Sequence, residues 1–235
     1  MTFKHRMIPL ALAAAMLCAG ASAEPPPAQQ ATLTAAQQAA DAGDYRRADD
    51  LLDDIKVSGL DATRQNQFNI LRAQILLARD EPEEALKWLR PSGVAGAQAA
   101  QIYWLRGQAL FGSGNAPGAT YELVQREKYL SPTQFSENRD AIWTGLFETP
   151  MDMSVLANLK NLDTTTRGWV ELAVLVREHG DLNGWRASYP GHPAASRIDS
   201  VRAGVSQPLA AQSQQAPQPA APTLWQRLFG GLFCV

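Results

Sequence analysis

A phrase of four residues returns along this chain after a fixed interval. Residues 71–80 read LRAQILLARD and residues 105–114 read LRGQALFGSG, so Leu-Arg-x-Gln recurs after thirty-four residues. Two sets of small residues keep the same frame, at intervals of thirty-four to thirty-seven residues. One set is Ala36, Ala73 and Gly107, and the other is Ala48, Ala85 and Ala119. A period of this length with small residues at two fixed points is typical of a helix-turn-helix repeat.

The period predicts an all-α fold, a tetratricopeptide-like solenoid of helical hairpins. In such a unit the small residues let two antiparallel helices approach each other closely. The predicted repeats lie near residues 29–62, 66–99 and 100–133. Between the two helices of each repeat we expect a turn, at residues 43–45, 80–82 and 114–116.

Arg72 and Arg106 depart from the usual pattern of these repeats. Each precedes the small residue of a first helix, where tetratricopeptide units usually carry a large apolar side chain. We therefore interpret the repeats as divergent, with the inward face of the first helices carried by other residues. These are Phe68, Leu71, Ile75, Ile102, Leu105 and Ala109.

Irregular helices are expected beyond the third repeat. Apolar residues at helical spacing predict helices at residues 137–147, 154–162, 164–179 and 182–188. The third of these has the clearest boundaries, with threonines at its start and Gly180 after its end. We expect His179 in its last turn, where a cation complements the helix dipole.

The first 23 residues predict a secretory signal peptide. Lys4 and Arg6 give a basic start, and an apolar run follows at residues 8–17. Ala21-Ser22-Ala23 then forms a small-x-small cleavage site. The apolar run is too short to span a bilayer permanently. We expect cleavage near Ala23 and a periplasmic protein.

Cys18 leaves a second localisation open, an outer-membrane lipoprotein acylated on this cysteine. Lipoprotein signals usually place a small residue before the cysteine, whereas this chain has Leu17 there. After cleavage near Ala23, Cys234 would be the only cysteine left, so no intramolecular disulfide would form.

Composition divides the remainder of the chain into four segments. They are a Pro-rich lead-in at 24–31, a helical-repeat domain at 32–203, a Gln/Ala/Pro linker at 204–222 and an apolar tail at 223–235. The linker holds too few apolar residues to order itself.

The apolar tail ends in LWQRLFGGLFCV. Burying its large apolar side chains yields ~10–15 kcal/mol, whereas ordering its residues costs about 18 kcal/mol. The tail therefore needs a docking surface, and we expect peripheral contact with a membrane or a partner. The contacting residues would be Trp225, Leu228, Phe229 and Phe233.

Charge and motifs exclude several classes of function. Without Lys4 and Arg6, 19 of the 21 basic residues remain against 23 acidic ones, and no block of like charge stands out. Nucleic acid is therefore not an expected partner. His179 and His192 lie in different segments, so no metal site is predicted. The glycines at 112–118 lack the lysine of a phosphate loop. We expect no cofactor and no enzymatic activity.

Glutamines occupy equivalent places in the repeats. The ninth position of each unit holds Gln37, Gln74 and Gln108, and the second position holds Gln30, Gln67 and Gln101. Residues seven apart share one face of a helix, and in tetratricopeptide stacks these positions line the concave groove. Glutamine amides suit an extended peptide backbone, so this face is a candidate partner-binding site. The alternative is that glutamine serves only as a good helix former in a chain rich in Ala and Gln.

Five stretches together resemble one known family, the LpoA-type activators of penicillin-binding proteins (the LppC family). They are LRAQILLARDEPEEALKWL at 71–89, LRGQALFGSG at 105–114, ENRDAIWTGL at 137–146, GWVELAVLVRE at 168–178 and WRASYPGHPA at 185–194. The resemblance covers roughly residues 32–200 and concerns the N-terminal domain of that family. It implies an envelope protein that stimulates peptidoglycan synthesis by binding a class A penicillin-binding protein.

Two departures from the family leave other functions open. Members are typically outer-membrane lipoproteins, and they carry a C-terminal domain like a periplasmic binding protein, in place of which this chain has the linker and tail. The alternatives are a general repeat scaffold in envelope assembly or secretion, or a truncated, non-activating remnant of the family. The solenoid of a peptidoglycan-cleaving enzyme is disfavoured, because no catalytic domain accompanies it.

Overall fold

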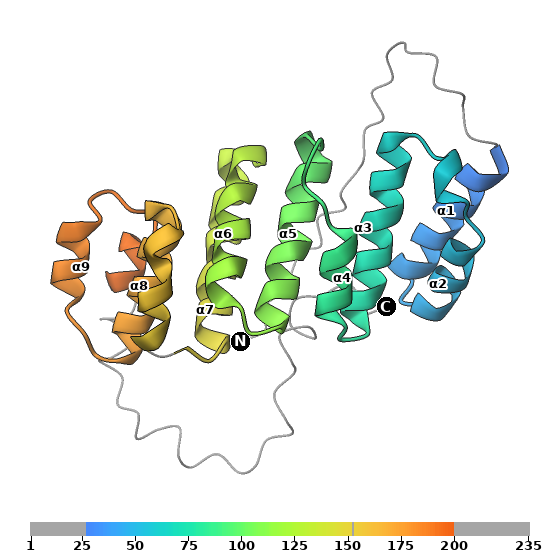
Figure 1. The fold of residues 1–235 in the computed structure, drawn as a ribbon. Coiled ribbons are helices and arrows are strands. Elements are labelled where there is room, and N and C mark those ends of the chain that lie inside the picture. The colour runs from blue at the N-terminus through green and yellow to red at the C-terminus, as the bar shows by residue number, and fades with distance from the viewer. Residues whose placement is uncertain (1–26, 152, 200–235) are drawn as a thin grey trace, which may run out of the picture.

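The computed structural model describes residues 27–151 and 153–199, and every regular element in those ranges is a helix. The helices stand side by side in one row, from α1 and α2 at one end to α8 and α9 at the other (Figure 1). This arrangement confirms the all-α, tetratricopeptide-like solenoid that the sequence period predicted.

Some predicted features lie outside the described residues. They are the signal peptide at 1–23 with Cys18, most of the lead-in, the linker at 204–222, and the tail with Trp225, Leu228, Phe229, Phe233 and Cys234.

Three helical hairpins form the first part of the row. Their first helices are α1 (Pro27–Asp41), α3 (Ala62–Ala78) and α5 (Gly96–Gly112). Their second helices are α2 (Tyr45–Asp53), α4 (Pro82–Trp88) and α6 (Ala116–Arg126). A short 3-10 helix, η1 (Val57–Gly59), joins the first hairpin to the second.

The three hairpins share one kind of turn. Gly43, Asp80 and Gly114 hold equivalent places and have φ angles of 77°, 63° and 80°. This left-handed conformation ends a helix and is easiest for glycine, with Asp among the few other residues that tolerate it. The side chains of Asp44 and Asn115 then open the second helices by accepting backbone N–H groups at 3.1 and 3.0 Å.

The small residues of the repeat lie where the paired helices touch. Every alanine of the two sets is fully buried: Ala36, Ala48, Ala73, Ala85 and Ala119. Gly107 makes the closest approach, because a Cβ built there would lie 2.8 Å from Cγ of Leu123. The third hairpin therefore brings Leu123 nearer to α5 than an alanine would allow.

The apolar core is divided along the row, and α3 belongs to two of its clusters. Toward the first hairpin α3 turns Phe68, Leu71 and Ile75. Toward α4 and α5 it turns Ile70, Ala73 and Leu77. A helix inside a solenoid is covered from both sides, so its apolar residues do not form a single stripe.

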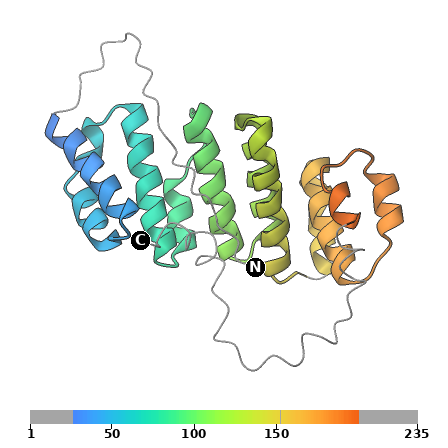
Figure 2. The same cartoon turned by 180° about the vertical axis from the view of Figure 1, so that it is seen from behind.

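The C-terminal part of the row is less regular. The 3-10 helices η2 (Glu127–Tyr129) and η3 (Pro132–Gln134) lead into α7 (Phe135–Glu148). The 3-10 segment η4 (Met153–Asn161) then precedes α8 (Thr164–Arg177) and α9 (Leu182–Ser188). A last helical turn at 195–199 lies at the same end of the row, as the view from behind shows (Figure 2).

Two details differ from the sequence prediction. The segment predicted as a helix at 154–162 is 3-10 rather than α-helical. The helix α8 ends at Arg177, so His179 does not lie in its last turn. His179 instead has a φ of 54° and terminates the helix, and the next N–H, that of Gly180, donates to the Leu175 carbonyl at 2.8 Å. The predicted dipole role of His179 is therefore wrong.

The helices α8 and α9 form a further hairpin that the sequence period misses. His179 takes the place of Gly43, Asp80 and Gly114 in its turn, which is one residue longer. Where the other second helices carry alanine, α9 carries Trp185, whose indole N–H donates to the Gly168 carbonyl of α8 at 3.0 Å. The longer turn and the large residue together hide the repeat.

Among the described helices, none combines the length and the apolar character that crossing a bilayer would require.

Candidate interaction surface

The first helices of the three hairpins lie next to one another, and polar side chains join their first turns. Arg64 on α3 donates to the Gln30 amide oxygen on α1 at 3.0 Å. Gln98 on α5 donates to the Thr63 carbonyl on α3 at 3.3 Å. These bonds link the faces of α1, α3 and α5 into one polar surface.

Four of the predicted partner-binding glutamines reach solvent on these helices. Gln37, Gln67 and Gln101 are exposed, and Gln74 is half-buried. The Gln37 amide donates to the Asp41 carboxylate on the same helix at 2.8 Å. We call these four residues the glutamine face.

Gln108 does not belong to the glutamine face, although the sequence predicted it there. Its side chain is only 3% exposed, and its neighbours Gly107 and Ala109 are buried as well. The C-terminal half of α5 is covered from both sides in the middle of the row, so position nine of this repeat faces the interior. Gln108 therefore cannot meet a partner at the surface.

Arg72 ties the second repeat to the first. Its guanidinium pairs with Asp49 on α2 and with Asp53, the latter at 2.5 Å. It also lies 5.7 and 5.8 Å from the ring centres of Phe68 and Trp88. An arginine held by two carboxylates and two aromatic rings is a structural tie between hairpins.

Arg106 holds the same place in the third repeat and makes the corresponding link. Its guanidinium donates to the Leu89 carbonyl at the end of α4 at 2.8 Å and pairs with Glu122 on α6 at 2.6 Å. The Glu122 side chain is 8% exposed. The two arginines that mark the repeats as divergent thus replace apolar contacts by ion pairs. The acidic residues of the second helices were the signal that could have indicated this.

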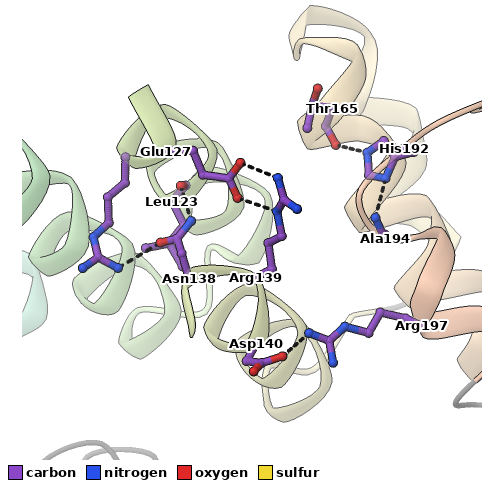
Figure 3. A network of polar contacts seen from close by, with 10 residues as sticks. Leu123, Glu127, Asn138, Arg139, Asp140, Thr165, His192, Ala194 and Arg197 are labelled. Atoms are coloured by element: carbon purple, nitrogen blue, oxygen red, sulfur yellow. Dashed lines mark hydrogen bonds and ion pairs between the residues drawn. The ribbon is translucent and has the colours of Figure 1, made fainter. Parts of the chain in front are cut away.

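A polar network joins α6 to α7 (Figure 3). The fully buried Asn138 accepts from Arg126 at 3.0 Å and donates to the Leu123 carbonyl at 2.8 Å. Arg139 forms a bidentate pair with Glu127 at 2.9 and 3.0 Å. The adjacent Asp140 pairs with Arg197 of the last turn. Burial of these bonds fixes the C-terminal helices on the third hairpin.

His192 lies in the same region and is 8% exposed (Figure 3). One ring nitrogen, Nε2, lies 2.8 Å from the Thr165 carbonyl, and the other, Nδ1, accepts the Ala194 N–H at 3.1 Å. Because a carbonyl can only accept, the ring is the neutral tautomer with its proton on Nε2. Burial lowers the pKa of His192, and Arg139 lowers it further, against the Thr165 bond and the charges of Asp163 and Glu127.

Three tyrosines gather at the surface of the third hairpin. Tyr121 and Tyr129 are 39% and 37% exposed, and Tyr103 on α5 is half-buried. The rings of Tyr103 and Tyr129 stack with centres 5.6 Å apart. Burial, followed by Tyr129, Glu122 and Tyr121, raises the pKa of Tyr103, which places all three rings in one neighbourhood. We call these residues the tyrosine cluster, which sequence reasoning missed because its members lie on different elements.

The described residues bring together no group of three or more side chains of the metal-binding types His, Cys, Asp and Glu. The chemistry of the surface is therefore that of amides, arginine-carboxylate pairs and tyrosines, which suit recognition of another chain.

The protonation of His192 predicts a pH-dependent stability. Its folded-state pKa lies below the unfolded value of about 6.5, so the unfolded chain takes up the proton first as the pH falls. Stability from this site is complete above that value and is lost below it. The thermal midpoint should therefore be lower at about pH 5 than at about pH 7.5. In this window Asp61, whose pKa is lowered chiefly by the Arg64 N–H, stays ionised in both states.

The matched comparison uses the two histidines of the C-terminal hairpin. His192→Gln should flatten the dependence of the midpoint on pH, whereas His179→Asn at the exposed left-handed position should leave it as in the unaltered chain. Equal slopes for all three proteins would contradict this assignment.

Comparison with known sequences finds one family along most of the chain. A family model described as LppC putative lipoprotein matches residues 9–215. Among curated proteins, Penicillin-binding protein activator LpoA of Aliivibrio fischeri is 24% identical over 165 residues, which are 66% of this chain and 27% of that protein. The protein of the same name from Vibrio cholerae is 28% identical over 149 residues, 58% of this chain and 24% of that one. The chain thus spans about a quarter of the length of these relatives.

Solved structures share the fold. LpoA of Haemophilus influenzae, in two monoclinic crystal forms, superposes with TM-scores of 0.54 and 0.53 at 19% identity. The match covers 75% of this chain and 34% of that one. At this identity the likeness concerns the arrangement of helices alone.

Proposed function

Since this chain belongs to the LppC family, we propose that it is a periplasmic, non-enzymatic protein-interaction domain that regulates peptidoglycan synthesis. Its partner is a class A penicillin-binding protein. One observation carries the proposal: the family match extends over the whole helical row, from α1 to the last turn. The relatives matched over this region are named as activators of penicillin-binding proteins.

The glutamine face is the proposed contact surface within the row. Its side chains lie on neighbouring first helices and offer amide donors and acceptors to an extended segment of the partner. Because Gln108 is buried, the surface uses the second position in the last two repeats and the ninth in the first two.

Direct binding tests the proposal. The purified chain, immobilised through its N-terminus, should retain a purified class A penicillin-binding protein, and a catalytically unrelated periplasmic enzyme should not be retained. Polymerisation of lipid-linked glycan by the bound synthase should change when the chain is added. Absence of binding to the class A proteins, together with capture of a different envelope protein, would replace this function by that of a general scaffold.

Substitution of the glutamine face gives the sharper result. We expect Gln67→Ala, Gln74→Ala and Gln101→Ala together to weaken binding about tenfold, a loss of roughly 1.4 kcal/mol. Gln65→Ala is the matched control, because Gln65 is exposed on α3 but lies two residues from Gln67 and so faces elsewhere. Equal affinities of the triple variant and the control would remove the glutamine face from the interface.

The proposed location is tested by the mass of the mature protein. Cleavage after Ala23 gives a chain that begins at Glu24, whereas a lipoprotein begins at an acylated Cys18. The mass of the protein recovered from the cell envelope separates these two products.

A further inference from the structure

The tyrosine cluster is a surface that the proposed function does not use. Tyr121 on α6 and Tyr129 on η2 present more than a third of their surface to solvent, beside the half-buried ring of Tyr103. Large aromatic side chains at a surface supply flat apolar faces together with a hydroxyl group, and tyrosine is enriched where chains bind one another.

The charged groups beside the cluster are already engaged. Glu122 pairs with Arg106 at 2.6 Å, and Glu127 forms its bidentate pair with Arg139. The Lys128 ammonium donates to the Gln125 amide oxygen. The cluster therefore offers aromatic faces and hydroxyls rather than a net charge, and it suits an uncharged occupant.

Residues 206–223 of this chain match that requirement. They contain no charged side chain, and their last part reads APQPAAP at 216–222. Proline rings pack well on aromatic faces, and a proline-rich strand pays little entropy on binding because its polyproline II conformation is already favoured. Its carbonyls make no internal hydrogen bonds and can accept from tyrosine hydroxyls.

The described chain also ends close to the cluster. Arg197, two residues before the last described residue, pairs with Asp140 of α7. The preceding residue on α7, Arg139, pairs with Glu127, which lies in η2 with Tyr129. Seventeen residues separate Asp199 from Ala216 and span at most ~60 Å when fully extended, so covalent reach is ample.

We infer that the tyrosine cluster binds the chain's own proline segment at residues 216–222. The three prolines at 217, 219 and 222 lie against the exposed rings of Tyr121 and Tyr129, within one molecule. The contact holds residues 200–222 along the third hairpin.

Fluorine NMR of the chain from Glu24 to Val235, labelled with 3-fluorotyrosine, tests the inference. The chain has five tyrosines, and Tyr45 and the buried Tyr189 serve as internal references because neither belongs to the cluster. Pro217→Ala, Pro219→Ala and Pro222→Ala together should shift the Tyr121 and Tyr129 resonances and leave the references unchanged. Addition of the free peptide APQPAAP at about millimolar concentration, the range that a short covalent linker provides, should reverse the shift.

Several outcomes would overturn the inference. The control Gln212→Ala, Ser213→Ala and Gln214→Ala changes the same segment without touching a proline, and a shift equal to that of the proline variant would refute proline recognition. A shift only with Trp225→Ser and Phe229→Ser would assign the cluster to the apolar tail instead. A shift of the unaltered chain on dilution would assign it to a second copy. Unchanged resonances in every variant would mean that the tail does not bind the cluster.

Discussion

Replacing Trp169 by alanine should lower the free energy of unfolding by about 3–5 kcal/mol. Trp169 on α8 is 1% exposed and lies in the largest buried cluster, 6.2 Å from the Trp143 ring and 5.8 Å from His192. Truncation leaves a cavity that α7, α8 and the turn at His192 line together. Because whole domains are stable by only about 5–15 kcal/mol, this one change removes much of the available stability.

Urea unfolding measures the loss, and hydrogen exchange shows where it acts. In a solenoid each unit contacts only its neighbours, so amides of α8 and α9 should lose protection before those of α1 to α4. Trp88→Ala is the matched control, since Trp88 is 36% exposed and its substitution removes less buried surface. Equal destabilisation by the two changes would contradict the assignment of Trp169 to the core.

Replacing Arg106 by methionine should cost about 3–5 kcal/mol, because it leaves a buried charge without its partner. Glu122 keeps a carboxylate that is 8% exposed, and the Leu89 carbonyl loses its donor. The double variant Arg106→Met with Glu122→Met should recover most of this stability, since both charges are then gone. Denaturation of the four proteins gives the interaction energy as a double-mutant cycle.

A surface pair provides the comparison for this cycle. Lys87 and Glu84 are 66% and 53% exposed at 2.5 Å, so Lys87→Met should change stability by no more than about 1 kcal/mol. A double variant as unstable as Arg106→Met alone would argue that the arginine acts through its bond to the Leu89 carbonyl rather than through the ion pair.

Much of the fold could be read from the order of residues. Glycine or aspartate at 43, 80 and 114 requires a left-handed turn, and the alanines that flank each turn require close helices. Both are local demands, so a period of thirty-four residues was sufficient to place three hairpins. The fourth, α8 and α9, was missed because its turn is one residue longer and Trp185 stands where alanine was expected.

The candidate site was less predictable. Four glutamines share a helical face with solvent, as their spacing indicated, but Gln108 has the same spacing and is 3% exposed. Helical periodicity gives the direction of a side chain and does not say which neighbouring element covers it. The tyrosine cluster was invisible for the related reason that Tyr103, Tyr121 and Tyr129 come from three different elements.

The sequence by itself determined the class of fold, the position of the turns and the small residues that set helix spacing, because these depend on backbone conformation and local volume. It also determined the family, through stretches spread along the helical row. Only the tertiary structure decided the roles of Arg72 and Arg106, which the sequence marked as irregular. Each finds acidic or carbonyl partners sixteen or more residues away along the chain. The energy of a buried charge depends on groups that packing brings within hydrogen-bond distance, and that distance does not exist until the hairpins stack.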